Sequence, residues 1–345
     1  MALRRKQIFA YLVCALGTAV LIAAACFLIN CLVDPLWYLR GNVLTGVNYP
    51  FNERLSKINR FLPRLRDYDC LILGSSRSTL LPVENFTGHH CVNFALSDGQ
   101  INEFELHARY LLARGLSPSL LIVDIRREDF IGPMPPPDVP DFIRTGEDPP
   151  SIFATYLSLD ALDFSIRTLR GDAPHHRYYN QNFDAVLEVR SSKHRYDPTA
   201  PIEPMPPPTD VHPERADFYM QLRQLFPSAR AIGYLPPESA SIIAAFSMTG
   251  GLDTYLGAVG RVAAAYDEFL DFAIPSPLTE SPEGTYDGSH YSEAVNARIA
   301  KALLADDAAP GVDWHRQDEA TIVALYHERL RQFLSTVKPA KVTSK

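Results

Sequence analysis

Hydrophobic positions along the chain alternate between short apolar runs and segments in which apolar residues recur every three or four positions. The short runs are bounded by glycine, proline or polar residues, a pattern that predicts buried β-strands. They occupy Cys70–Leu73, Cys91–Ala95, Leu120–Ile125, Ala231–Leu235 and Phe269–Ile274.

Helical spacing separates these runs. It occupies roughly residues 52–65, 101–112, 213–226, 254–267, 292–305 and 317–335. Strands that alternate with helices are typical of a parallel sheet with helices on both faces. We therefore expect an α/β protein with three layers, α/β/α, around a central parallel sheet.

The first apolar run is much longer than a strand. Residues 7–33 contain no charge, Arg4, Arg5 and Lys6 precede them, and Asp34 follows. About 20 apolar residues cross a bilayer, whereas the apolar part of a signal peptide is roughly 7–15 residues long. Because basic flanks stay on the cytoplasmic side, we predict a single-pass inner (plasma) membrane protein with a cytoplasmic N-terminus and an extracytoplasmic domain. A cleaved signal peptide is the alternative.

Proline-rich stretches interrupt the alternation of strands and helices. Pro-Met-Pro-Pro-Pro occurs at residues 133–137 and again at 204–208. Polyproline is stiff, extended and unable to join a central strand. These stretches predict an insertion at about residues 133–215, with a helix near residues 151–169. The insertion is either a surface segment without a task or a cap over a functional site.

The expected domain organisation follows from these features. The segments are residues 1–34 (cytoplasmic tip and transmembrane helix), 35–66 (juxtamembrane segment), 67–336 (the α/β domain with its insertion) and 337–345 (basic tail).

Composition limits the function classes. The chain has 345 residues, of which 46% are hydrophobic and 21% charged, as expected for a globular protein with a buried core. Its formal net charge is −7, and the three cations before residue 7 make the remainder more acidic still. An acidic domain is a poor partner for phosphates, so we expect no nucleic-acid binding.

The cysteines and most of the histidines indicate little about function. Cys70 and Cys91 fall within predicted strands, where they form either a disulfide in an oxidising compartment or, as we expect, buried thiols. The histidines outside the motif described below show no metal-ligand spacing, and the adjacent pair among them is at best a weak surface site; they are His89, His90, His107, His175, His176, His194, His212, His315 and His327. We therefore expect no metal and no cofactor.

Two short motifs carry the candidate chemistry. The first predicted strand runs into Gly74-Ser75-Ser76, and in open α/β sheets reactive groups gather at the carboxyl ends of strands. Asp287 and His290 lie three residues apart just before a predicted helix. A serine needs a histidine to accept its proton, and the histidine needs an anion to orient it. Each motif alone also fits a helix N-cap, but together they indicate a triad of Ser76, His290 and Asp287.

The order and placement of the motifs resemble the SGNH, or GDSL-like, hydrolase superfamily. Gly74-Ser75-Ser76 stands where that family has Gly-Asp-Ser, which implies that Ser76 is the nucleophile. Asp287 and His290 match the acid and the base. The resemblance implies a flavodoxin-like sheet and covers roughly residues 67–132 and 229–305.

The resemblance also implies an oxyanion hole. The family's second block, an asparagine followed by a glycine, is similar to the stretch from Asn93 to Gly99. Gly99 is then the expected donor through its N–H, together with the N–H of Ser76.

This chain departs from the family's pattern in the third block. It normally supplies an asparagine side chain to the hole, but Arg126-Arg127-Glu128-Asp129 follows the third strand here. Losing one such donor costs about 2.7–4 kcal/mol of transition-state stabilisation. We predict that Arg126 or Arg127 faces the Ser76 pocket as a substitute. Pairing of either arginine with Glu128 or Asp129 is the alternative.

These resemblances imply a membrane-anchored, extracytoplasmic serine esterase or O-acyltransferase. Membrane-tethered proteins of this layout resemble accessory proteins that add or remove O-acyl groups, expected to be acetyl, on bacterial surface polymers. The expected partners are the membrane, an acylated envelope polysaccharide or lipid, and an envelope protein complex. The departures at Ser75 and in the third block leave a second hypothesis, a catalytically silent SGNH-like scaffold of an envelope or exopolysaccharide complex.

Overall fold

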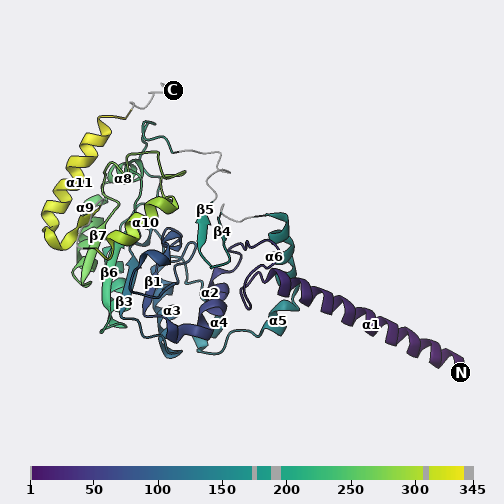
Figure 1. The fold of residues 1–345 in the computed structure, drawn as a ribbon. Coiled ribbons are helices and arrows are strands. Elements are labelled where there is room, and N and C mark those ends of the chain that lie inside the picture. Colours follow the sequence, from purple (N-terminus) through teal and green to yellow (C-terminus); the bar gives the residue numbers. More distant parts are fainter. Residues whose placement is uncertain (1, 173–176, 188–195, 306–310, 338–345) are drawn as a thin grey trace. The chain divides into compact units, whose positions relative to one another are not determined.

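The computed structural model describes residues 2–172, 177–187, 196–305 and 311–337. The chain forms two compact units, residues 1–60 with 148–183 and residues 61–147 with 184–345 (Figure 1). The histidines at 175, 176 and 194 and the tail from residue 338 lie outside the described residues.

The larger unit is an α/β fold built on a six-stranded sheet of order β2-β1-β3-β6-β7-β8 (Figure 1). All neighbours in the sheet pair in parallel except β8, which pairs antiparallel with β7. The strands are β1 (Cys70–Leu73), β2 (Cys91–Asn93), β3 (Leu120–Asp124), β6 (Arg230–Leu235), β7 (Glu268–Asp271) and β8 (Val312–Asp313).

Burial of the strands explains why short apolar runs mark them in the sequence. Every residue of β1, β2 and β3 is buried, as in parallel sheets with both faces covered. The predicted α/β fold with a central parallel sheet is therefore confirmed. The two-residue strand β8 was not predicted, because it is too short to produce a pattern.

Most helices of the larger unit lie where apolar spacing predicts them. The exceptions are α4, whose five residues are too few to show a helical period, and α8, whose apolar residues leave almost no polar positions to mark an exposed face. The α-helices are α3 (Ile101–Ala113), α4 (Asp141–Thr145), α7 (Ala216–Gln224), α8 (Ala240–Ser247), α9 (Leu252–Ala263), α10 (Glu293–Ala302) and α11 (Glu319–Leu334). Short segments of 3₁₀ helix occupy Leu62–Asp67, Ser78–Leu80, Val83–Asn85, Arg127–Phe130, Pro213–Arg215 and Trp314–Arg316. A further short strand, β5, spans Ala185–Leu187.

A disulfide joins the first two strands. Cys70 of β1 and Cys91 of β2 are register partners, and their sulfur atoms are 2.12 Å apart. The expectation of buried thiols was wrong. The reason is that the pairing register sets the two cysteines side by side, and a single sequence does not define the register between strands.

The smaller unit is built around the apolar N-terminal helix. It contains α1 (Ala2–Val33), most of α2 (Glu53–Phe61), α5 (Ile152–Tyr156), α6 (Leu159–Arg170) and β4 (Arg177–Tyr179). The stretch Arg4–Val33 of α1 contains an 18-residue window with a mean hydropathy of 2.7, none of which is buried, so this helix is long and apolar enough to cross a membrane. A signal sequence passes the same test.

Polar contacts explain why residues 148–183, the middle of the predicted insertion, belong to the smaller unit. Asn30, near the end of α1, donates to the carbonyl of Tyr156 (2.9 Å) and accepts from Ser165 (2.7 Å). The hydroxyl of Tyr156 donates to the buried carboxyl group of Asp34, which also accepts the N–H of Gly41 (2.6 Å). The ends of the insertion belong instead to the larger unit. The predicted domain boundaries at residues 34, 66 and 336 stay predictions.

Candidate active site

Ser76 lies in the turn that directly follows β1. This strand stands between β2 and β3, where the strand order reverses and ligands of open α/β sheets bind. Gly74 leads into the turn, and a Cβ there would lie 2.6 Å from Cγ of Asp124, so no side chain fits. The carbonyl of Ser76 accepts the hydroxyl of Thr79 (2.7 Å). The turn therefore holds Ser76 at the carboxyl edge of the sheet.

The carboxyl group of Asp124, at the end of β3, shapes this turn from below. Its Oδ2 accepts both the N–H and the Oγ of Ser75, each at 2.8 Å, and the Oγ of Ser78. Asp124 is fully buried, and this burial raises its pKa. Ser75, at the position where the resembled family has aspartate, is thus bonded beneath the turn.

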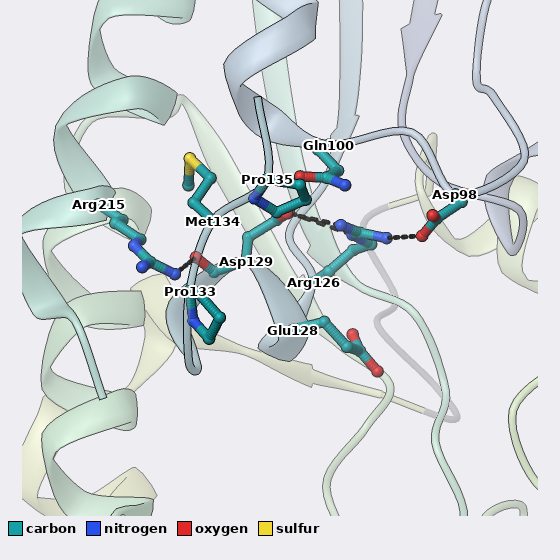
Figure 2. A pocket seen from close by; sticks show the side chains of 9 residues that line it. All are labelled: Asp98, Gln100, Arg126, Glu128, Asp129, Pro133, Met134, Pro135 and Arg215. Atoms are coloured by element: carbon teal, nitrogen blue, oxygen red, sulfur yellow. Dashed lines mark hydrogen bonds and ion pairs between the residues drawn. The ribbon is translucent and has the colours of Figure 1, made fainter. Parts of the chain in front are cut away.

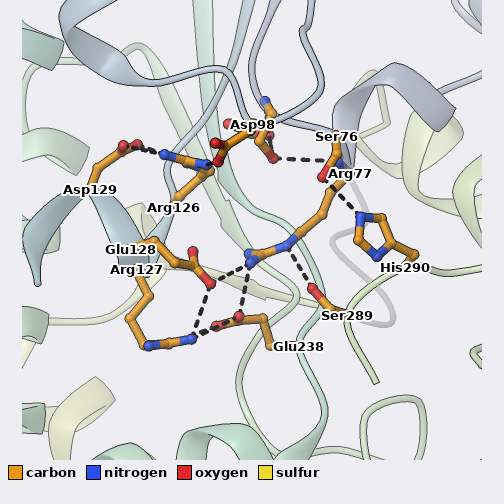
Figure 3. Close-up of polar contacts among 12 residues, drawn as sticks. Ser76, Arg77, Asp98, Arg126, Arg127, Glu128, Asp129, Glu238, Ser289 and His290 are labelled. Carbon is orange, nitrogen blue, oxygen red and sulfur yellow. Dashed lines mark hydrogen bonds and ion pairs between the residues drawn. The ribbon is translucent and has the colours of Figure 1, made fainter. Parts of the chain in front are cut away.

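The structure brings the three predicted catalytic side chains into one hydrogen-bonded row. The Oγ of Ser76 lies 2.8 Å from Nε2 of His290 (Figure 3), and Nδ1 of His290 lies 2.8 Å from Oδ2 of Asp287. Because Nδ1 faces a carboxylate, it carries the proton of a neutral imidazole, and Nε2 is then an acceptor for the hydroxyl of Ser76.

The loop before α10 explains why an aspartate and a histidine three residues apart can meet. Oδ1 of Asp287 accepts the N–H groups of Ser289 (2.9 Å) and His290 (2.7 Å), which folds the carboxylate back onto its own loop. Gly288 has φ +79°, a conformation that other residues rarely adopt. Burial alone would raise the pKa of Asp287, but its bonds with His290 and Ser289 lower it to about 2. Asp287 is therefore ionised at neutral pH.

An ion network that sequence reasoning missed lies beside the row (Figure 3). Arg77, the residue after Ser76, contacts Glu128 (2.6 Å) and Glu238 (3.0 Å) through Nη2, and its Nε donates to Ser289 (3.1 Å). Burial would lower the pKa of Arg77, but the two glutamates raise it. Burial would likewise raise the pKa of Glu128, but Arg77 and Arg127 lower it. Arg77 and Glu128 therefore hold each other in their charged forms.

A signal for this network exists in the sequence. Glu238 follows β6 and Glu128 follows β3, so both glutamates stand just beyond the carboxyl ends of parallel strands, as Ser76 does. Charged residues at these positions meet at one edge of the sheet.

The two arginines that were expected to face the Ser76 pocket are each bound to carboxylates. Arg126 contacts Asp129 through Nε (3.2 Å) and Nη2 (2.7 Å). Arg127 contacts Glu238 through Nε (3.0 Å) and Nη2 (3.2 Å), with its guanidinium 5.4 Å from the ring centroid of Phe246. Arg127 also contacts Glu128 (3.1 Å), so each arginine makes a pairing that the sequence left open as the alternative. The pairing of Arg127 with Glu238 was not foreseen.

The expected donor Gly99 is also engaged. Its N–H donates to the carbonyl of Leu96 (2.9 Å), which closes a turn in which Asp98 has φ +52°. The N–H of Gly99 is used in a turn bond that the sequence does not reveal. The prediction that Gly99 donates to the oxyanion is therefore corrected. Within the described part of the chain, the N–H groups of Ser76 and Asp98 have no hydrogen-bond partner.

Two cavities adjoin the site, and each is lined by one copy of the Pro-Met-Pro-Pro-Pro motif. A cavity of about 270 Å³ reaches Glu128 and includes Pro133, Met134 and Pro135 (Figure 2). A second, of about 430 Å³, reaches Asp287 and is lined by residues of the other copy, Pro204, Met205 and Pro206. Both ends of the predicted insertion thus contribute walls to the site.

Comparison with known proteins adds little to this geometry. The chain matches no protein-family model and none of the curated proteins. A similar solved structure is that of a Streptococcus pneumonia protein provisionally described as a platelet activating factor, with 14% identity and a TM-score of 0.37 over 73% of this chain and 93% of that one. At that TM-score the likeness carries no argument. The class rests on the molecule itself: an α/β protein with a Ser-His-Asp row at the reversal point of a parallel sheet.

Proposed function

We propose that the protein is a membrane-anchored, extracytoplasmic serine hydrolase of the SGNH type. It is an esterase or O-acyltransferase that acts on O-acyl groups, foremost acetyl, of an envelope polysaccharide or lipid. The observation that carries the proposal is the row of Ser76, His290 and Asp287, with 2.8 Å at each of its two contacts. Ser76 is partly exposed, and a serine that only shaped the turn would not need a histidine that is itself paired with a carboxylate.

The proposed reaction has two halves, and the same three side chains act in both. Ser76 Oγ attacks the ester carbonyl while Nε2 of His290 takes its proton, and the ionised Asp287 stabilises the imidazolium. The tetrahedral oxyanion collapses to an acyl-serine, and His290 returns the proton to the departing alcohol. Water then releases the acid, or a second hydroxyl group takes the acyl group, with the same proton transfers.

We propose that the N–H groups of Ser76 and Asp98 bind the oxyanion. Both lack partners among the described residues, and backbone donors fixed before the reaction stabilise such charge without reorganisation. This assignment moves the second donor by one residue from Gly99.

Two observations support a location outside the cytoplasm. The helix α1 is long and apolar enough for an anchor, and the Cys70–Cys91 disulfide belongs to a type that persists in oxidising compartments. Alkaline phosphatase fused after Lys345 should be active, whereas a green fluorescent protein fused there and exported unfolded should be dark. The reverse pattern would place the domain in the cytoplasm. Recovery of the intact N-terminus from the membrane fraction separates an anchor from a cleaved signal.

Labelling with a fluorophosphonate tests the catalytic proposal, because this probe reacts only with an activated serine. The full-length protein in detergent should be labelled, and Ser76→Ala should abolish the labelling. Ser75→Ala, which removes the neighbouring hydroxyl of the same motif, is the matched control and should retain it in folded protein.

A catalytically silent scaffold is the second candidate. It is favoured by the engaged N–H of Gly99 and by the absence of an asparagine from residues 126–129. In that case the folded wild-type protein shows no labelling, and its function resides in binding to an envelope complex.

A further inference from the structure

The smaller cavity, of about 270 Å³, is lined by Asp98 and Glu128 among others (Figure 2), and both belong to loops that contact the serine turn. The loop that carries its lining residue Asp98 is tied to the start of the Ser76 turn, since Leu96 donates to the carbonyl of Gly74 (2.8 Å). On another side Glu128 lines the cavity and contacts Arg77, the residue after Ser76. Two walls of this cavity are therefore connected to the residues that flank Ser76.

The cations that line the cavity are already committed. Arg126 is held by both oxygens of Asp129. Arg215 donates to the carbonyls of Asp129 (3.1 Å) and Gly132 (2.6 Å). Both side chains are buried in these contacts, so neither is free to receive an incoming anion as its main partner.

The groups that remain available are an exposed carboxylate and an amide. Asp98 has 90% of its side chain exposed, and among the described residues its one charged contact is Arg126 at 3.7 Å. The side-chain amide of Gln100 has no hydrogen-bond partner within the described residues. A carboxylate accepts hydrogen bonds and repels anions, while an amide both donates and accepts. The cavity thus favours a ligand rich in hydroxyl groups and disfavours one with negative charge.

The opposite wall is apolar and rigid. It consists of Pro133, Met134 and Pro135, and Asn102 fixes it by donating to the carbonyl of Pro135 (2.8 Å). Ligand sites commonly combine apolar walls with a few placed polar groups. A sugar ring fits this combination, because its hydroxyl edge and its C–H face can engage different walls. A phospholipid headgroup would instead place its phosphate near the carboxylate of Asp98, and the two negative charges would repel each other.

We infer that this cavity binds a sugar without negative charge, neutral or amine-bearing, as the group that carries or receives the acyl chain. The inference rests on the proposed function and narrows its substrate from an envelope polysaccharide or lipid to an uncharged or cationic polysaccharide. It also gives a task to the first Pro-Met-Pro-Pro-Pro copy, as the wall of the sugar subsite.

Binding is tested on full-length Ser76→Ala protein in detergent, which cannot turn over its ligand. Calorimetric titrations use tetrasaccharides of glucose, galactose, mannose and glucosamine, the tetramers of the three corresponding uronic acids, and phosphatidylglycerol vesicles. At least one neutral or amine-bearing tetramer should bind at least about tenfold more tightly than its uronate counterpart, a difference of about 1.4 kcal/mol.

Variants in the same background locate the binding. Gln100→Ala should weaken the preferred tetramer about tenfold, as expected for one or two lost hydrogen bonds. Asp98→Asn should narrow the discrimination against the uronate. Asp141→Asn, an exposed aspartate of α4 outside both cavities, is the matched control and should change neither value.

Three results would overturn the inference: uronates bound as tightly as neutral tetramers, vesicles bound and no tetramer bound at millimolar concentration, or affinity indifferent to Gln100→Ala. The proposed function is judged separately by fluorophosphonate labelling of the wild type. A labelled protein that binds no sugar refutes the subsite alone, and an unlabelled protein that binds sugar refutes catalysis alone.

Discussion

Two aspartates serve the same serine turn, and their surroundings shift their pKa values in opposite directions. Asp287 is 32% exposed, accepts bonds from His290 and Ser289, and has its pKa lowered to about 2. Asp124 is fully buried, Oδ1 finds no partner among the described residues, and burial raises its pKa. Both carboxyl groups end hydrogen-bonded chains that involve residues 75–78, but only the pKa of Asp287 is lowered.

The difference shows what each carboxyl group can do. A group that must stabilise an imidazolium has to stay ionised, which needs donors and contact with solvent. A group that only fixes a turn can be buried, because three hydroxyl and N–H donors around one oxygen are useful in either protonation state. The chemistry of the residue is the same, and its surroundings decide its role.

The largest expected effect is on turnover at Asp287. Asp287→Asn should lower acetyl-ester turnover about 10⁴-fold, because an amide favours the wrong tautomer of the histidine. Hydrolysis of a small acetyl ester by the full-length protein measures it, with the unfolding midpoint as a control for folding. A loss of less than about tenfold would mean that the row does not perform the chemistry.

Asp124 should behave in the opposite manner. Asp124→Ala leaves the donors of Ser75 and Ser78 without a buried acceptor, and we expect a loss of about 3 kcal/mol in the free energy of unfolding. Asp124→Asn keeps an acceptor and should recover most of it. Urea titrations compare both with Asp287→Ala, whose carboxylate is partly exposed and should cost less. Equal losses at the two positions would erase the distinction between them.

Sequence patterns predicted one of these aspartates and not the other, for a physical reason. Asp287 and His290 interact within a single loop, so their spacing alone places them together, and the strand that ends at Ser76 sets the remaining contact. Asp124 acts across two strands, and its bond with Ser75 depends on how β1 and β3 align. The fold class follows from alternation of apolar runs, which reports burial directly.

The oxyanion region was less predictable for a related reason. Whether the N–H of Gly99 points into a site depends on one turn bond to Leu96, which no residue pattern encodes. Arg127 pairs with its neighbour Glu128, which the sequence offered as a candidate. It also pairs with Glu238, more than 100 positions away in the chain, which the sequence could not offer. Contacts within a local motif could be predicted from the sequence, whereas pairing between charges far apart in the chain could not.

Arg77 gives a smaller effect that sharpens the comparison, because it ties the Ser76 turn to the Asp287 loop through Ser289. Arg77→Lys cannot reproduce the fork that contacts Glu128, Glu238 and Ser289 together. We expect kcat to fall about tenfold with KM within twofold, since the change misplaces His290 without touching substrate. Arg127→Lys is the matched control, because it shares Glu238 but does not contact Ser289. A change in KM alone would assign Arg77 to binding.

The smallest expected effect is the dependence of stability on pH, and it has opposite signs at the two aspartates. The pKa of Asp287 is lowered from 3.8 to about 2, so its contribution is complete above about pH 4 and is lost as the pH falls towards 2. Partial exposure limits this contribution to the order of 1 kcal/mol. The pKa of Asp124 is raised, so its contribution is complete below about pH 4 and declines as the pH rises.

Urea titrations of the wild type, Asp287→Asn and Asp124→Asn between pH 2 and pH 7 separate the two contributions. The advantage of the wild type over Asp287→Asn should grow with pH, whereas its advantage over Asp124→Asn should shrink. If both stability differences changed with pH in the same direction, the two pKa values would be shifted in the same direction. The contrast between the aspartates would then be wrong.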